Sequence, residues 1–221
     1  MGPLLLATAN PHKVDELRAI FAAAIPDLEL KSLDQLPGGP PPEPLETGDT
    51  FEANASIKAR AYAQASGLAC LADDSGLEID ALQGRPGVIS SHYNSDGREV
   101  GMTRAQRDEA NNRRVLHELR DVPLHLRSAR FVCVMALCTS ADSGLSLSLC
   151  RGTFEGRIGL PGEVPRGTHG FGYDPIFLVA PEYTRTGAEL EPAEKNLASH
   201  RANAAKLMVT RLASLRAHPP A

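Results

Sequence analysis

The sequence predicts a mixed α/β fold built on a central sheet. In the N-terminal half, short apolar runs of strand length alternate with segments of helical periodicity. Two long strand candidates, 128–139 and 145–154, follow and are joined by a turn at 140–144, which adds a long antiparallel pair. Of the 221 residues, 42% are hydrophobic and 23% are charged, so we expect residues 1–221 to form a single domain of two intimately packed lobes.

Each element of the first half has its own signal. Apolar runs and apolar stripes predict strands at 4–8, 28–33 and 68–72 and helices at 10–24 and 47–66. The stretch 37–44, PGGPPPEP, must be a loop, because proline fixes φ and lacks the N–H donor that a helix or central strand needs. Gly67 stands where a helix C-terminus prefers the left-handed conformation, so it should end the second helix.

The second half is less regular. Composition and periodicity predict an extended segment at 77–82, a surface loop at 83–97, a charged helix at 99–120, a functional loop at 156–172, a short strand at 175–179 and a closing helix at 199–215. Ser199 is of a residue type that favours the N-cap of that last helix.

Composition also excludes several classes of protein. The net charge of -4 lacks the excess of Lys and Arg that sequence-independent nucleic-acid binding needs. The cysteines lie in apolar runs without a C-x-x-C pair, so we expect buried thiols at Cys70, Cys133, Cys138 and Cys150. The N-terminal segment has no basic region of a signal peptide, and no apolar stretch approaches the roughly 20 residues of a membrane span. We therefore expect a cytoplasmic protein with neither a nucleic-acid nor a membrane partner.

The first polar cluster follows the first predicted strand. The run TANPHK places Thr8 and Lys13 at a helix N-terminus, where unpaired N–H groups and a partial positive charge favour phosphate. Asn10 is also a natural N-cap. Taken alone, the run is better explained as a capped helix with an exposed lysine, because it lacks the glycines of a Walker loop.

The second cluster, DDSG, contains two adjacent carboxylates at the end of an apolar strand. Asp73 and Asp74 repel one another, and a divalent cation such as Mg²⁺ relieves that repulsion. Strand alternation points the two side chains to opposite faces, so one of them is expected to enter a site. An Asp-Ser-Gly turn at a strand end explains the same run equally well.

Two charged residues flank the second predicted helix. An acidic residue such as Glu46, just before a helix, is favoured by the helix dipole alone, so its functional interpretation depends on whether it faces Asp74. Lys58, further along the same helix, is expected to be solvated.

The run GFGYDP and the later run SHR complete the candidate site. Glycines on both sides of Phe171 let the backbone approach a flat ligand, and the ring could stack on a nucleobase, a contact worth roughly 1–3 kcal/mol. A core aromatic at a turn is the alternative. Lys195, His200 and Arg201 would bring donor side chains to one point at a helix start, as a receptor for carbonyl oxygens or phosphate.

Taken in order, these clusters resemble one family. Seven runs carry the resemblance: ATANPHK, ETGDTFEANASIKA, LADDSGLEIDAL, GRPGVISSHY, GTFEGRI, GTHGFGYDPIF and EKNLASHRANA. They are similar to the runs of the inosine triphosphate pyrophosphatases, the nucleotide house-cleaning enzymes also called XTP/dITP diphosphatases. The resemblance implies an elongated α/β molecule, usually a homodimer, in which a long mixed sheet forms the floor of a cleft between two lobes.

The same resemblance implies an activity and a site. The chain would be a Mg²⁺-dependent hydrolase that cleaves XTP, ITP and dITP to the nucleoside monophosphate and pyrophosphate, removing them from the nucleotide pool. Glu46 and Asp74 would hold the metal, and Asp74 would accept a proton from water. The implied substrate-binding residues are Thr8, Ala9, Asn10, Pro11, His12, Lys13, Ser75, Phe171, Gly172, Tyr173, Asp174, Lys195, His200 and Arg201. An enzyme for pyrimidine or methylated nucleotides and a non-catalytic nucleotide-binding module remain as other hypotheses.

Overall fold

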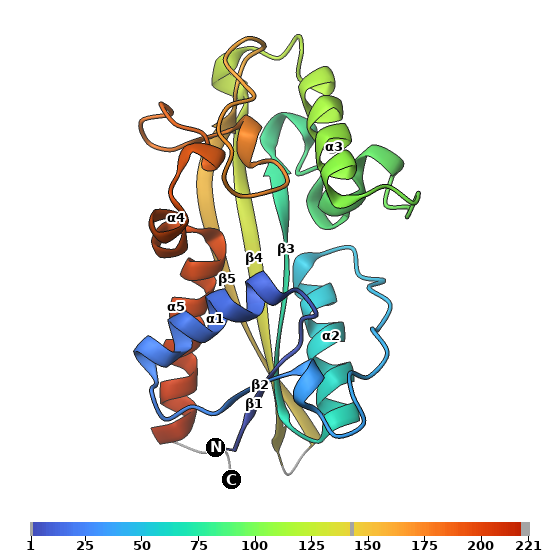
Figure 1. The fold of residues 1–221 in the computed structure, drawn as a ribbon, viewed down its shortest axis with the longest axis vertical. Coiled ribbons are helices and arrows are strands. Elements are labelled where there is room, and N and C mark those ends of the chain that lie inside the picture. Colours follow the sequence, from blue (N-terminus) through green and yellow to red (C-terminus); the bar gives the residue numbers. More distant parts are fainter. Residues whose placement is uncertain (1, 142–143, 218–221) are drawn as a thin grey trace. The chain divides into compact units, whose positions relative to one another are not determined.

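The structure, a computed structural model, describes residues 2–141 and 144–217 (Figure 1). The described residues form a six-stranded sheet in the order β2-β1-β3-β4-β5-β6. The strands are β1 (Leu4–Leu6), β2 (Leu30–Ser32), β3 (Ala69–Ile79), β4 (Ser128–Ala141), β5 (Gly144–Ile158) and β6 (Phe177–Val179). β1 is parallel to β2 and β3, with Leu5 opposite Lys31 and Cys70, whereas β5 and β6 are antiparallel. The predicted α/β class with a mixed sheet is therefore confirmed.

The chain folds into two compact units, each assembled from separate segments. Unit 1 comprises Met1–Asp74, Cys133–Gly152 and Arg201–Ala221, and unit 2 comprises Ser75–Val132 and Thr153–His200. The helices are α1 (Pro11–Ala24), α2 (Phe51–Ser66), α3 (Arg104–Glu118), α4 (Pro192–Ala198) and α5 (His200–Ala217). β3, β4 and β5 each give one part to each unit, and the boundary in β3 falls immediately after Asp74.

In unit 1, helices cover both faces of the sheet. α1 and α5, which lie next to one another in Figure 1, share an apolar cluster with one face of β1, β3 and β4. The larger members of this cluster are Leu4, Leu6, Leu17, Phe21, Leu71, Met135, Met208 and Leu212. Leu5 and Cys70 alternate with these strand residues, so they face the other side of the sheet, where they are also fully buried. Tyr62 of α2 is buried near Cys70. α2 therefore covers the opposite face.

The core of unit 2 is a second cluster, built around aromatic side chains. The ring centroids of Phe131 and Phe177 are 4.7 Å apart, and those of Phe154 and Phe177 are 5.9 Å apart. Val115 of α3 and the following Leu119 are fully buried in the same cluster. α3 is thereby fixed to the strands of its own unit.

Capping residues explain where the predicted helices differ from the observed ones. α2 begins at Phe51 rather than at 47, because the Thr50 hydroxyl accepts the Ala53 N–H at 3.1 Å. α3 begins at Arg104 rather than at 99 because Thr103 caps it in the same way. Gly67 has a φ of 68° and ends α2 as predicted. α4 was not predicted, since seven residues are too few to show a helical period.

The prediction of a strand end or turn at residues 73–76 is wrong. β3 runs without interruption from Ala69 to Ile79. Gly76 is needed there for close approach rather than for a turn: a Cβ at this position would lie 2.7 Å from the Gly87 carbonyl oxygen and would also clash with the Ser90 hydroxyl. The predicted turn at 140–144 falls partly outside the described residues.

The expectations drawn from composition can be compared with the described residues. Cys70, Cys133 and Cys138 are buried free thiols, as predicted, and Cys150 is a half-buried one. Within residues 2–141 and 144–217, no helix combines the length and the hydropathy needed to cross a bilayer.

Candidate active site

The two adjacent aspartates of β3 point to opposite faces of the sheet, as strand alternation predicts. On the face covered by α1 and α5, Asp73 Oδ2 lies 2.8 Å from Lys13 Nζ and 3.5 Å from Arg201 Nε. On the face covered by α2, Asp74 Oδ1 lies 3.6 Å from Lys58 Nζ. Each carboxylate therefore has its nearest cations on its own face of the sheet, although Lys58 also acts on Asp73 and Lys13 on Asp74 at longer range.

The Asp73 cluster joins acidic and basic side chains of β3, α1 and α5. Arg201 also donates to Glu16 at 3.0 Å, so two acidic and two basic side chains balance. Burial alone would raise the pKa of Asp73, but the charges of Lys13 and Arg201 outweigh it and hold that pKa well below its usual range. Burial raises the pKa of the adjacent Cys133 thiol to about 12, so the thiol stays protonated and is not a nucleophile.

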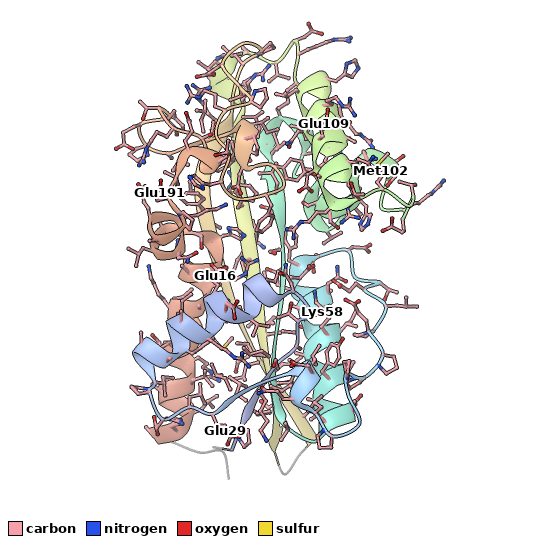
Figure 2. All side chains as sticks on the ribbon, viewed as in Figure 1. Glu16, Glu29, Lys58, Met102, Glu109 and Glu191 are labelled. Atoms are coloured by element: carbon pink, nitrogen blue, oxygen red, sulfur yellow. The ribbon has the colours of Figure 1, made fainter. Side chains whose placement is uncertain are left out.

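The Asp74 cluster has unequal charges. Lys58 Nζ lies 3.0 Å from Glu46 Oε2 and 3.6 Å from Asp74 Oδ1, so one ammonium group contacts two carboxylates. Figure 2 labels Lys58 on α2. Burial and the Glu46 charge raise the pKa of Asp74 despite the neighbouring Lys58 and a hydrogen bond from Asn54. Burial would lower the pKa of Lys58, but the surrounding carboxylates outweigh it and raise that pKa. The predicted meeting of Glu46 with Asp74 thus occurs around a lysine.

The segment before α2 positions Glu46. Asn54 Oδ1 accepts the Gly48 N–H at 2.8 Å, which ties the end of the Pro-rich segment to the helix that carries Lys58. A Cβ on Gly48 would lie 2.8 Å from that same oxygen, so only glycine fits. Asn54 therefore contacts Asp74 and also Gly48, which lies two residues after Glu46, and so links the segment of Glu46 to Asp74.

The predicted phosphate segment lies between β1 and α1. The Thr8 hydroxyl accepts the Asn10 N–H at 3.2 Å, and the Asn10 carbonyl accepts the Val14 N–H at 3.1 Å, so Asn10 occupies the N-cap position. Ala9 is exposed. The side chains of Pro11 and His12 lie outside the described part of the structure. Lys13 uses one donor on Asp73, and its side chain remains 21% exposed.

In unit 2, the glycine-rich loop holds Phe171 in an exposed position. Phe171 is 47% exposed, and Asp174 Oδ2 accepts its N–H at 2.8 Å. Asp174 is buried and also pairs with Lys195. Tyr173 belongs to the core: its side chain is buried, and its hydroxyl donates to the Ser90 carbonyl at 2.6 Å. Phe171 is therefore the side chain of this loop that can meet a flat ligand.

The expected meeting of Lys195, His200 and Arg201 at one point stays a prediction, and each of the three has a separate partner within its own unit. Lys195 pairs with Asp174 in unit 2, and the His200 ring stacks on Phe131 with centroids 5.3 Å apart. Arg201 belongs to unit 1 and pairs with its acidic groups there. Neighbouring side chains at the start of a helix point about 100° apart, which sends successive residues to different partners. Ser75 follows Asp74 as the first residue of unit 2.

Comparison with known proteins decides the family. The sequence model described as "Ham1 family" matches residues 4–211. The chain belongs to the Ham1 family.

Relatives of this Ham1 chain match it over almost their whole length. A dITP/XTP pyrophosphatase from Pseudomonas aeruginosa is 46% identical, with 95% of this chain and 96% of the relative covered. One from Frankia alni is 47% identical, with the same two shares. Among solved structures, a HAM1 protein from Coxiella burnetii has a TM-score of 0.79 and 40% identity, covering 97% of this chain and 100% of its own. Both units therefore belong to the common Ham1 structure.

Sequence reasoning missed Lys58 as a site residue. The expectation that it is solvated is wrong: Lys58 is 9% exposed. Its helix position gave a usable signal, because it lies on the same stripe as the buried residues Phe51, Asn54 and Tyr62, at spacings of seven and four residues. A lysine within an apolar stripe is buried only if acidic partners face it.

The residues around Asp74 fit a divalent cation with a preference for oxygen. Among the described residues, no group of three or more His, Cys, Asp or Glu side chains is placed to hold a metal, so a closed protein cage of the zinc type is not formed there. Mg²⁺ instead uses one or two carboxylates and completes its shell with water and phosphate. Glu46 and Asp74 supply two such carboxylates, one on either side of the Lys58 ammonium.

Proposed function

We propose that this chain hydrolyses non-standard purine nucleoside triphosphates, namely XTP, ITP and dITP, to the monophosphate and pyrophosphate. The observation that carries the proposal is the Glu46–Lys58–Asp74 cluster, in which a buried carboxylate with a raised pKa stands beside a second carboxylate. Membership of the Ham1 family and relatives named dITP/XTP pyrophosphatases support the substrate class.

Asp74 is the proposed proton acceptor. A carboxylate with a raised pKa is a stronger base than an exposed aspartate, so it removes a proton from an attacking water more readily. The Lys58 charge lowers the pKa of Asp74 and so partly offsets the larger effect of burial. The attack of that water on the α-phosphorus breaks the bond to the bridging oxygen and releases pyrophosphate.

Glu46 and Asp74 are the residues proposed to hold Mg²⁺. When bound there, the ion would neutralise phosphate charge and lower the pKa of a bound water. Lys13 has two N–H donors beyond the one that it uses on Asp73, and with Thr8 and Asn10 it orients the phosphates at the N-terminus of α1.

Recognition of the base is assigned to unit 2. The exposed ring of Phe171 provides a stacking surface, and Lys195 lies 5.6 Å from the centroid of this ring. A 6-carbonyl on the purine accepts a hydrogen bond, whereas the 6-amino group of ATP leaves a protein donor unpaired. His200 and the Lys195 ammonium are the donors proposed for this discrimination.

Product analysis on ITP tests the proposal. Inosine monophosphate and pyrophosphate should form with Mg²⁺ and should not form when the metal is chelated. Asp74→Asn should bind ITP and lose turnover, while Glu52→Gln, which alters an exposed acid of α2, serves as the matched control. Stepwise release of phosphate, equal rates on ITP, ATP and GTP, or a preference for pyrimidine or methylated nucleotides would contradict the proposal. Binding without turnover would indicate a non-catalytic module.

We also propose a homodimer in the cytoplasm, on the strength of the family resemblance. Light scattering after size-exclusion chromatography should give twice the mass of one chain, and a single-chain mass would overturn this assignment.

A further inference from the structure

One face of α3 lies along the loop that carries Phe171. Three α3 side chains, spaced one turn apart, contact this loop within unit 2. The Arg104 guanidinium carbon lies 4.3 Å from the centroid of the Phe171 ring. Asp108 Oδ2 accepts the Gly172 N–H at 3.0 Å, and Asn112 Nδ2 donates to the Gly172 carbonyl at 3.0 Å. The spacing of four residues puts all three side chains on the same face of the helix.

These contacts fix the peptide groups next to Phe171. Gly172 has a φ of 63°, a conformation that side chains other than glycine rarely adopt, and α3 ties down both its N–H and its carbonyl. The peptide group on the N-terminal side of Phe171 is held as well, because Asp174 Oδ2 accepts the Phe171 N–H at 2.8 Å. The backbone that orients the ring is therefore held by side-chain hydrogen bonds on both sides.

The loop borders a cavity of about 420 Å³ on the α3 side. Its lining includes Asp108, Asn112, Phe171 and Gly172, together with apolar residues of α3 and of the segment after the loop. A segment that borders a cavity lacks part of the close packing that fixes a core residue, so its conformation depends more on individual hydrogen bonds. Arg104 lies over the ring, and the Phe171 side chain as a whole remains 47% exposed, which leaves ring surface for a stacked base.

We infer that Asp108 and Asn112 are positioning residues for purine recognition, because they hold the Gly172 peptide in the conformation that presents Phe171. The inference rests on the proposed function only in identifying the base as the group that Phe171 meets. Neither side chain acts on the phosphates, so the predicted effect is confined to the base end of the substrate.

The test compares variants of α3 on substrates with and without a base. Asp108→Ala and Asn112→Leu each remove one hydrogen bond to Gly172, whereas Asp108→Asn keeps an acceptor oxygen and should restore it. Glu109→Ala is the matched control, since Glu109 borders the same cavity but its carboxylate pairs with Arg113, 3.5 Å away on the same helix. Figure 2 labels Glu109 on α3. Each variant is measured for KM and kcat on ITP, for the inhibition constant of inorganic tripolyphosphate, and for its melting temperature.

The expected result separates base from phosphate. KM for ITP should rise about tenfold in Asp108→Ala and Asn112→Leu, with kcat within about twofold of wild type and the tripolyphosphate inhibition constant unchanged. The double variant should be little worse than either single one, because both act on one peptide. A parallel rise for ITP and tripolyphosphate, or a lower melting temperature with an unchanged KM, would overturn the inference.

Amide exchange distinguishes this inference from the proposed function. The Gly172 N–H should exchange faster in Asp108→Ala than in wild type, and at the wild-type rate in Glu109→Ala, whether or not ITP is a substrate. If wild type fails to cleave ITP but Gly172 loses its protection, the proposed function fails and the positioning role stands. If ITP is cleaved and Gly172 exchange does not change, the positioning role fails alone.

Discussion

Asp73 and Asp74 should respond to the same substitution in opposite ways. Asp73→Asn is expected to destabilise the fold, whereas Asp74→Asn is expected to leave stability unchanged or higher while abolishing turnover. The reason is that native contacts lower the pKa of Asp73 and raise that of Asp74. An ionised carboxylate stabilises the fold when its pKa is lower in the folded than in the unfolded state. When the pKa is higher in the folded state, the ionised carboxylate destabilises the fold.

The magnitude for Asp73 follows from the burial of its partners. The Asp73 side chain is 2% exposed and that of Arg201 5%, so the substitution leaves a buried guanidinium without one of its two acids. Breaking a buried pair costs about 3–5 kcal/mol, and we expect the lower end because Glu16 remains 3.0 Å from Arg201. Lys13, being 21% exposed, can recover water. At about 3 kcal/mol and about 2–4 °C per kcal/mol, the melting temperature should fall by roughly 6–12 °C.

Thermal melts followed by circular dichroism measure this effect at several pH values. The lowered pKa of Asp73 means that its contribution is fully present above about pH 3.9 and is lost as the pH falls further, so the gap between wild type and Asp73→Asn should close in acid. Asp27→Asn is the control, since it alters an ion pair to Arg216 whose acid is 79% exposed. Equal melting temperatures of Asp73→Asn and Asp27→Asn at pH 7 would refute the reasoning.

Three further outcomes are expected. Gly76→Ala should lower the free energy of unfolding by about 1–3 kcal/mol in urea titrations, since its Cβ would overlap the Ser90 hydroxyl; a neutral effect would contradict the close approach in β3. N-ethylmaleimide should label half-buried Cys150 first and buried Cys133 only after unfolding, as read by peptide mass spectrometry; early labelling of Cys133 would disagree with its pKa of about 12. Burial and a hydrogen bond to an α3 glutamate raise the pKa of Tyr93 to about 12, so wild type should lose stability between about pH 10 and 12 relative to Tyr93→Phe; parallel stability curves for the two proteins would exclude this.

Much of the fold could be predicted because its signals are local. Gly67 ends α2 in the left-handed backbone conformation, which glycine adopts more easily than other residues, so the residue type alone indicates the helix end. The opposite orientation of Asp73 and Asp74 follows from strand geometry alone. The wrong prediction of a turn at Gly76 has a different origin. The local run Asp-Asp-Ser-Gly indicates a turn, whereas the groups that require a glycine here, including Ser90, lie more than ten residues away in the sequence.

The candidate site was harder to predict where it depends on distant segments. The burial of Lys58 depends on which sheet face α2 covers, and that face carries Asp74 only because β3 continues past it. Asp108 and Asn112 lie 64 and 60 residues before Gly172, which they contact. No local pattern in a charged helix indicates a contact over such a sequence separation.

The charges on the two faces of β3 explain why a cation belongs on one of them. Around Asp73, two acids face two basic groups, and the pKa of Asp73 is lowered, so a further positive charge would gain little. Around Asp74, two acids have Lys58 as their nearest cation, and burial and the Glu46 charge raise the pKa of Asp74, so a bound cation would stabilise its ionised form. A divalent ion is therefore favoured on the α2 face. Removing the nearest positive charge with Lys58→Met should strengthen Mg²⁺ binding in calorimetry more than Lys13→Met does, because the Lys13 charge acts on Asp74 only from the other face. Equal affinities in the two variants would mean that local charge does not select the face.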